Sequence, residues 1–162
     1  MKFRVLVATS VIGAAVLLAG SAVATAASAK TVPFKGSYAG RAIVRATGDT
    51  AALSATGVGT GTVIGKGTIT GTGIGANQQP CPLFSGKGTL TGKTGRINFT
   101  VMQGATSCPG ASESDPNVLK GTVKVVGGTG VFKTAKGTLT LGGTYTRATG
   151  KYAVTFSGKL TM

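Results

Sequence analysis

Apolar and polar residues alternate one by one along most of the chain after residue 30. The pattern is clearest at Ile97–Val101, Leu119–Val125, Leu139–Leu141 and Tyr152–Phe156, where aliphatic or aromatic residues at every second position are separated mostly by Thr, Asn, Lys or Ala. A period of two places one face of a strand in a core and the other in water, which is typical of antiparallel sheets. The pattern therefore predicts an all-β protein.

The spacing of glycine-containing turns predicts how the strands are connected. Candidate turns occur at Gly65-Lys66, Gly92–Gly95, Gly127-Gly128 and Ala148–Gly150. Strands of ordinary length separated by such turns leave room for about eight strands after residue 30. Eight strands close a barrel whose interior is filled by side chains or holds one small ligand, and closure removes exposed sheet edges. We therefore expect a single antiparallel β-barrel.

A phrase close to Lys-Gly-Thr-Leu-Thr occurs four times, at irregular intervals. The copies are Lys66–Thr70, Lys87–Thr91, Lys120–Lys124 and Lys136–Thr140. We interpret the phrase as a strand entry in which Gly permits a turn and Lys and Thr then face outward. Outward charges of this kind discourage pairing between the sheet edges of different molecules.

Glycine occupies many odd-numbered positions between residues 57 and 75, and on one strand these would form a bare face. The positions are Gly57, Gly59, Gly61, Gly65, Gly67, Gly71, Gly73 and Gly75. Glycine weakens a strand unless the backbone must bend or something approaches it closely. Two interpretations stay open: a glycine-tolerant hairpin of a small barrel, and a face kept bare for a ligand or another subunit.

The first 29 residues have the features of a cleaved export signal. Lys2 and Arg4 precede an uncharged apolar stretch from Val5 to Gly20, and Ala27-Ser28-Ala29 supplies a small-x-small cleavage pattern. The alternative is a transmembrane anchor, which needs roughly 20 apolar residues, and this stretch is shorter. We expect a secreted or envelope-associated barrel domain, residues 30–162, with no transmembrane anchor after processing.

Composition excludes several kinds of chemistry. The chain has no His and no Trp, and its acidic residues are Asp49, Glu113 and Asp115. Without His there is no Ser-His-Asp triad and no imidazole metal site. Three acids, two of them in the Ser-rich stretch around Ser114, fall short of a carboxylate metal cage. We therefore predict no catalytic, cofactor-binding or metal-binding residues.

The chain from residue 30 carries fifteen basic and three acidic residues, a net charge of +12. Such a charge is compatible with plain solvated faces or with attraction to anionic envelope polymers or lipid headgroups. Nucleic-acid binding is not expected, because Arg is not clustered and aromatic residues are few.

Cys81 and Cys108 are the only cysteines, and in an exported chain they predict a disulfide. If Leu90 faces Phe99 across the Gly92–Gly95 turn, the same register brings Cys81 opposite Cys108 at the open end of the hairpin. Closing this loop should contribute roughly 3–4 kcal/mol to stability. A redox or metal site is the less favoured alternative, because there is no Cys-x-x-Cys spacing.

Residues 126–137, Val-Gly-Gly-Thr-Gly-Val-Phe-Lys-Thr-Ala-Lys-Gly, resemble the signature turn of the dirigent and allene oxide cyclase-like β-barrels and their small secreted bacterial relatives. The matching positions are Gly127, Gly128, Thr129, Gly130, Phe132, Ala135 and Gly137. The resemblance covers residues 118–160 best and implies an eight-stranded barrel, often trimeric, with an apolar cavity. The turn also has its own physical interpretation: glycines allow a tight reversal, and Phe132 and Ala135 fold back over the barrel end.

Members of that family isomerise a fatty-acid epoxide or orient phenoxy radicals, with acidic and polar residues inside the cavity. No such residue maps onto this chain. Tyr38, Tyr145 and Tyr152 would line a cavity or cap the core with one wet edge, and Asn98-Phe99-Thr100 is a chance match to a glycosylation acceptor.

Three functions follow as hypotheses. The first is a non-catalytic barrel that binds a small hydrophobic ligand or has a structural role in the envelope. The second is a cyclase-like or dirigent-like protein, and the third is a cationic cell-envelope adhesion module.

Overall fold

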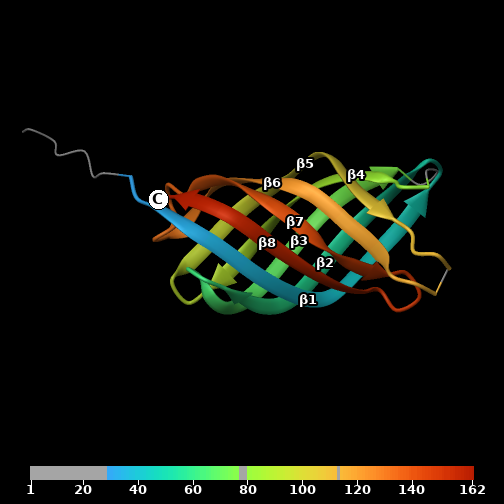
Figure 1. Ribbon diagram of the computed structural model, residues 1–162, viewed down its shortest axis with the longest axis horizontal. Coiled ribbons are helices and arrows are strands. Elements are labelled where there is room, and N and C mark those ends of the chain that lie inside the picture. Colours follow the sequence, from blue (N-terminus) through green and yellow to red (C-terminus); the bar gives the residue numbers. More distant parts are fainter. Residues whose placement is uncertain (1–28, 77–79, 113) are drawn as a thin grey trace, which may run out of the picture.

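The computed structural model describes residues 29–76, 80–112 and 114–162, and shows a closed eight-stranded antiparallel β-barrel (Figure 1). Each strand pairs with the next, and β8 pairs with β1. The strands are β1 (Thr31–Thr47), β2 (Thr50–Gly61), β3 (Gly65–Ala76), β4 (Leu83–Gly92), β5 (Gly95–Cys108), β6 (Asn117–Gly130), β7 (Lys136–Thr146) and β8 (Lys151–Thr161). The predicted fold class is confirmed. The predicted export signal, residues 1–29, lies outside the described residues except for Ala29.

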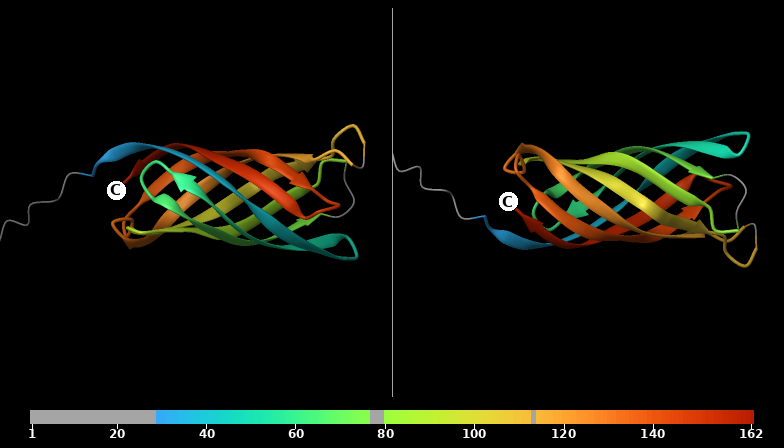
Figure 2. Two further views of the ribbon diagram at one scale, coloured as in Figure 1. Left: turned by 90° about the horizontal axis from the view of Figure 1, so that it is seen from below. Right: turned by 90° about the horizontal axis from the view of Figure 1, so that it is seen from above.

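Up-and-down connectivity gives the barrel two different ends (Figure 2). The turns after β2, β4 and β6 lie at one end, together with the start of β1 and the end of β8. We call this the plugged end, because Ile64, Phe132 and Ala135 from its turns are buried in the core. The loops after β1, β3, β5 and β7 lie at the other end, which we call the disulfide end.

The inward faces of the strands form one core, and the predicted alternation is confirmed on β5, β6, β7 and β8. Rings fill the space that glycines on the same or neighbouring strands leave open. Phe99 lies over Gly88 of β4, and Tyr38 lies against Gly36 and Gly59. Phe156 contacts both of these rings, with ring centroids 6.1 Å from Tyr38 and 5.5 Å from Phe99. Alternating large and small inward residues is how a narrow barrel is filled.

The odd-numbered glycines of β2 and β3 face inward apart from Gly65, which is exposed at the start of β3, and several of them bring backbones together. A Cβ atom on Gly59 would run into the backbone carbonyl of Ser37, and one on Gly57 would meet Ala39 and, at 2.6 Å, the Tyr152 hydroxyl. These positions therefore exclude side chains because neighbouring strands and rings occupy the space. The hairpin interpretation accounts for the glycine face without a ligand.

The disulfide joins Cys81 to Cys108 as predicted, although the register used to predict it is wrong. Phe99 faces Gly88, while Leu90 faces Ile97. A β-bulge between Phe84 and Gly86 in the pairing adds two residues to β5, so that Phe84 faces Ala105. Gly104 lies in this bulge with φ of 91°, a conformation that favours glycine. The two extra residues in β5 shift the pairing beyond the bulge, so that Cys81 and Cys108 lie opposite each other.

Two other local predictions need correction. Lys66 and Lys136 do begin strands, but Lys87 and Lys120 lie inside β4 and β6, so their copies of the repeated phrase are not strand entries. Outward exposure of all four lysines is confirmed.

Gly127-Gly128 is also not a reversal, because β6 continues to Gly130 and the chain turns at residues 131–135. Gly127 instead has φ of 107° where the β5–β6 register shifts, and a Cβ on Gly128 would run into the Arg96 carbonyl.

Gly59→Ala should destabilise the barrel by about 2 kcal/mol, because the new methyl group overlaps the backbone of β1. Gly71→Ala is the matched control on the same inward face. Its Cβ would lie 3.4 Å from the Lys87 carbonyl oxygen, an ordinary contact, so its effect should stay between neutral and a gain of about 1 kcal/mol. Chemical denaturation of both variants measures the difference. Equal stability of the two would contradict the close-approach explanation.

Candidate functional site

The barrel interior holds two buried phenol groups without a described partner. Tyr38 and Tyr152 are 1% and 8% exposed, and neither hydroxyl has a hydrogen-bond partner among the described residues. Burial raises the pKa of the Tyr38 phenol to about 12 and also raises the pKa of Tyr152. Tyr38 lies inside β1 and is fully buried, so it does not cap the core with a wet edge, whereas Tyr145 is half-buried.

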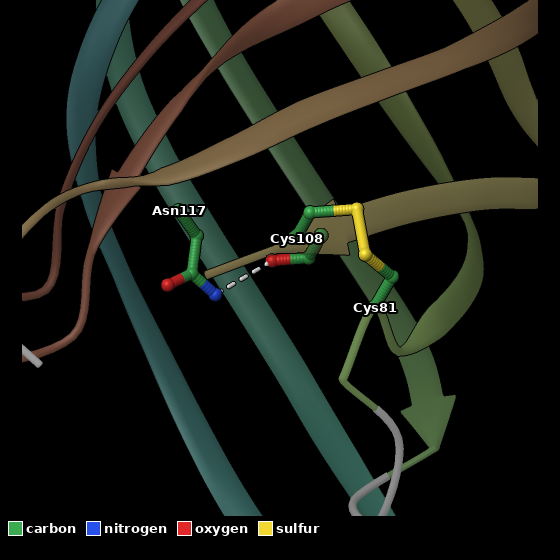
Figure 3. Close-up of a disulfide and its surroundings, with 4 residues drawn as sticks. Cys81, Cys108 and Asn117 are labelled. Carbon is green, nitrogen blue, oxygen red and sulfur yellow. Dashed lines mark hydrogen bonds between the residues drawn. A yellow bond between two sulfur atoms is a disulfide. The ribbon is translucent and has the colours of Figure 1, made fainter. Parts of the chain in front are cut away.

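A small polar cluster stands beside the disulfide (Figure 3). Asn117, the first residue of β6, is 3% exposed, and its Nδ2 donates to the Ser107 Oγ at 3.0 Å. Ser107 immediately precedes Cys108, so this bond ties the start of β6 to the cross-linked end of β5. The geometry explains a structural role for the disulfide, which is also consistent with an oxidising compartment.

The described acidic side chains lie in loops of the disulfide end. Asp49 is in the β1–β2 turn, and Asp115 is in the loop before β6, where its Oδ2 accepts from the Ser112 backbone N–H at 2.9 Å. Glu113 lies outside the described residues. Within the described parts of the chain, no three His, Cys, Asp or Glu residues gather as metal ligands. No helix in those parts is long and apolar enough to cross a membrane.

Two adjoining hollows lie on the outer wall of the barrel rather than inside it. The first, of about 450 Å³, crosses β2 to β5 and is lined by outward Ser, Thr and Asn side chains over Gly71 and Gly88. The second, of about 650 Å³, crosses β3 to β5 and includes the exposed side chains of Ile74 and Met102. Lys87 lines both hollows. Asn98 lies at the first hollow, on the outer face of β5, and accepts a hydrogen bond from Thr89.

Lys87 belongs to a continuous outward row in which lysine and hydroxyl residues alternate from strand to strand. We call it the Lys–Thr row, and its members face one another across β2 to β8: Ser54, Thr72, Lys87, Thr100, Lys124, Thr138 and Lys159. All seven are exposed. Successive lysines are two strand spacings apart, about 10 Å.

The row winds around the barrel because the strands are staggered. It leaves β1 at Ile43, opposite Ser54, and returns to β1 at Pro33, opposite Lys159, ten residues earlier in the chain. The row therefore runs from near the disulfide end on β2 to near the plugged end on β8. Sequence reasoning expected lysine and threonine to face outward, but it could not align them because it lacked the register.

The residues of the predicted family turn close one end of the barrel. Phe132 and Ala135 are fully buried, as predicted, and the turn is held by a bond from the Ala135 N–H to the Phe132 carbonyl at 3.0 Å. The last four residues of β6 are Gly127, Gly128, Thr129 and Gly130, and Gly137 is the second residue of β7. These residues explain the plugged end and supply no reactive group.

No protein-family model, curated protein or solved structure matches the chain. The fold is an eight-stranded antiparallel β-barrel, and kinship with the dirigent and cyclase-like barrels stays a prediction.

Tyr38→Phe should raise the free energy of unfolding at neutral pH by about 1 kcal/mol, because it removes a buried hydroxyl without a described partner. It should also change the alkaline behaviour. From about pH 10 the unfolded chain loses this phenol proton, whereas the folded protein holds it until about pH 12, so the wild-type free energy of unfolding falls in this window. Denaturant titrations across that range should show a shallower fall for the variant.

A clear loss of stability in Tyr38→Phe at neutral pH would contradict this prediction, since it would mean that the hydroxyl has a partner inside the barrel. Tyr152→Phe is a second test, and this variant should also show a shallower fall in the free energy of unfolding at alkaline pH than the wild type.

Proposed function

We propose that the protein is a non-catalytic binding module for a linear anionic polymer of the cell envelope, held by the Lys–Thr row. The observation that supports this best is the row itself, in which Lys87, Lys124 and Lys159 alternate with Thr100 and Thr138 on five successive strands. A flexible polymer with repeated negative charges can follow such a row. Each lysine supplies a point charge, and the hydroxyl groups between them supply hydrogen bonds.

The surroundings of the row favour anions. The described carboxylate side chains, those of Asp49 and Asp115, lie in loops and not in the row. Exposed charges about 10 Å apart are screened from one another at physiological ionic strength, where the Debye length is roughly 8 Å. The lysines therefore act nearly independently, and affinity accumulates along the polymer.

Aromatic placement argues against nucleic acid as the polymer. Every described Phe and Tyr is buried or half-buried, so the outer wall offers no ring for bases to stack on. This supports a polyanion without bases, such as a phosphodiester polymer.

A triple variant, Lys87→Gln/Lys124→Gln/Lys159→Gln, should bind immobilised polyphosphate more weakly than the wild type. The slope of log affinity against log salt concentration should fall by about two, because three charge contacts are lost. The matched control, Lys35→Gln/Lys120→Gln/Lys151→Gln, removes the same charge outside the row and should keep most of the affinity and slope. Retention on a polyphosphate column over a salt gradient measures both.

Equal losses in the two triple variants would mean that charge alone, and not the row, binds the polymer. Elution of the wild-type protein at low salt would contradict the proposed function itself.

A small hydrophobic ligand is a second candidate, supported by the larger hollow. Ile74 and Met102 are 65% and 42% exposed there, and the hollow is shallow and open to solvent. An apolar ligand would then bind on the wall, because aromatic and aliphatic side chains fill the core.

Met102→Glu should abolish binding of an apolar fluorescent probe at this hollow, because the charge disfavours apolar contact there. Val58→Glu, at an exposed apolar residue of β2 outside both hollows, is the control and should leave probe binding unchanged. Equal probe binding by the wild type and Met102→Glu would exclude this candidate.

A cyclase-like or dirigent-like activity has less support. That chemistry calls for acidic groups inside a cavity, whereas Asp49 and Asp115 are exposed in loops at the disulfide end.

A further inference from the structure

The plugged end carries a concentration of lysines that the linear sequence does not reveal. Three turns and the first residues of the barrel meet there and bring together five exposed lysines, which we call the lysine rim: Lys30, Lys66, Lys93, Lys133 and Lys136. Arg96 and Lys159 lie on strands close to the same end. Arg45, Arg147 and Lys151 lie at the disulfide end together with the described carboxylate side chains, so the net positive charge is more concentrated at the plugged end.

An exposed apolar side chain stands among these lysines. Val131, at the tip of the β6–β7 turn, is 61% exposed, and its backbone N–H bonds to the Thr94 carbonyl of the neighbouring β4–β5 turn at 3.4 Å. Two turns are thereby joined, with Lys93 beside Thr94 and Lys133 close to Val131 in the chain. An exposed apolar side chain on a turn next to lysines is an arrangement of proteins that rest on anionic lipid surfaces.

The path of the chain points in the same direction. The first described residues join the barrel at the plugged end, where Lys30 and Met162 exchange backbone hydrogen bonds of 3.0 and 2.9 Å. The described chain therefore enters the barrel at the lysine rim. If residues 1–29 are the predicted export signal, the barrel is connected to that signal at the rim.

We infer that the plugged end docks onto an anionic lipid bilayer, with the lysine rim at the headgroups and Val131 entering the interface. A bilayer fits this surface better than a linear polymer because the lysines surround the end of the barrel instead of forming a row. The Lys–Thr row approaches this surface at Lys159, but the five lysines of the rim lie outside the row, so docking does not depend on the proposed polymer binding.

The absence of Trp from the chain allows a direct test of orientation. In a barrel beginning at Lys30, which contains all eight strands, Val131→Trp places a single indole at the rim. Its emission should shift to the blue on vesicles of phosphatidylcholine and phosphatidylglycerol but not on phosphatidylcholine alone. Val118→Trp, at an exposed valine near the disulfide end, is the matched control and should not shift.

Charge removal tests the rim itself. A quadruple variant of the rim, Lys66→Gln/Lys93→Gln/Lys133→Gln/Lys136→Gln, should bind the anionic vesicles roughly a hundredfold or more weakly. The reason is the attraction that each lysine near such a surface contributes. Lys87→Gln/Lys120→Gln/Lys124→Gln/Lys151→Gln removes the same charge from the wall and should stay within about threefold of the parent protein. Circular dichroism checks that every variant keeps the β-fold.

Three results would overturn the inference. The first is an unchanged Val131→Trp emission on vesicles that bind the protein, and the second is equal loss of vesicle binding in the two quadruple variants. The third is binding to polyphosphate without binding to anionic vesicles, which would leave the proposed polymer binding in place and exclude docking onto a bilayer.

Discussion

Close packing between aromatic rings and glycines controls the architecture of this barrel. Phe99 over Gly88, and Tyr38 against Gly36 and Gly59, show the arrangement in its simplest form. An eight-stranded barrel has an interior that side chains can fill or that can hold one small ligand, and here buried side chains form the core. Because the backbones of neighbouring strands approach closely at the glycines, large rings from the other positions can occupy the axis without leaving voids. The glycine content, which first suggests a weak or disordered chain, is therefore a requirement of the packing.

Because side chains occupy the interior, the polar and charged groups that could bind a partner lie on the outside of the barrel. The buried hydroxyls of Tyr38 and Tyr152 have no acidic or basic side chain described beside them, whereas the outer wall carries hydroxyl and ammonium groups in register. Neither the Lys–Thr row nor the lysine rim exists in any single segment. The row depends on how six pairs of strands align, and the rim depends on alternate turns meeting at the same end.

The sequence predicted those features that depend on local alternation. The alternation of inward and outward positions placed Val123, Leu139 and Phe156 in the core. The two cysteines, together with the expected oxidising compartment, predicted the disulfide. The β5 bulge at Gly104 escaped prediction because an inserted pair of residues leaves little trace in a Gly- and Thr-rich strand, and the correct disulfide followed from a register that was wrong near the turn. The Gly127-Gly128 pair misled for a related reason, since a glycine with positive φ serves a bulge as well as a turn.

The candidate sites were less predictable, although one signal was available. In a meander of eight strands every second connection lies at the same end, so adding up charge over alternate turns would have revealed the lysine rim. The Lys–Thr row had no such signal, because shifting one strand by two residues would move its lysine out of line while preserving every inward and outward face.

Closure between the first and last strands has a consequence for biogenesis. β1 is 17 residues long, and the backbones of its first residues, Thr31 to Phe34, pair with β8 and not with β2, while the Lys35 carbonyl also accepts a bond from the Thr62 N–H of the β2–β3 turn. These contacts join the most distant parts of the described chain and require long-range loop closure. Until β8 has emerged, the leading strand has one open edge along its whole beginning. The barrel therefore acquires its sealed, edge-free form only once the last strand has paired with the first.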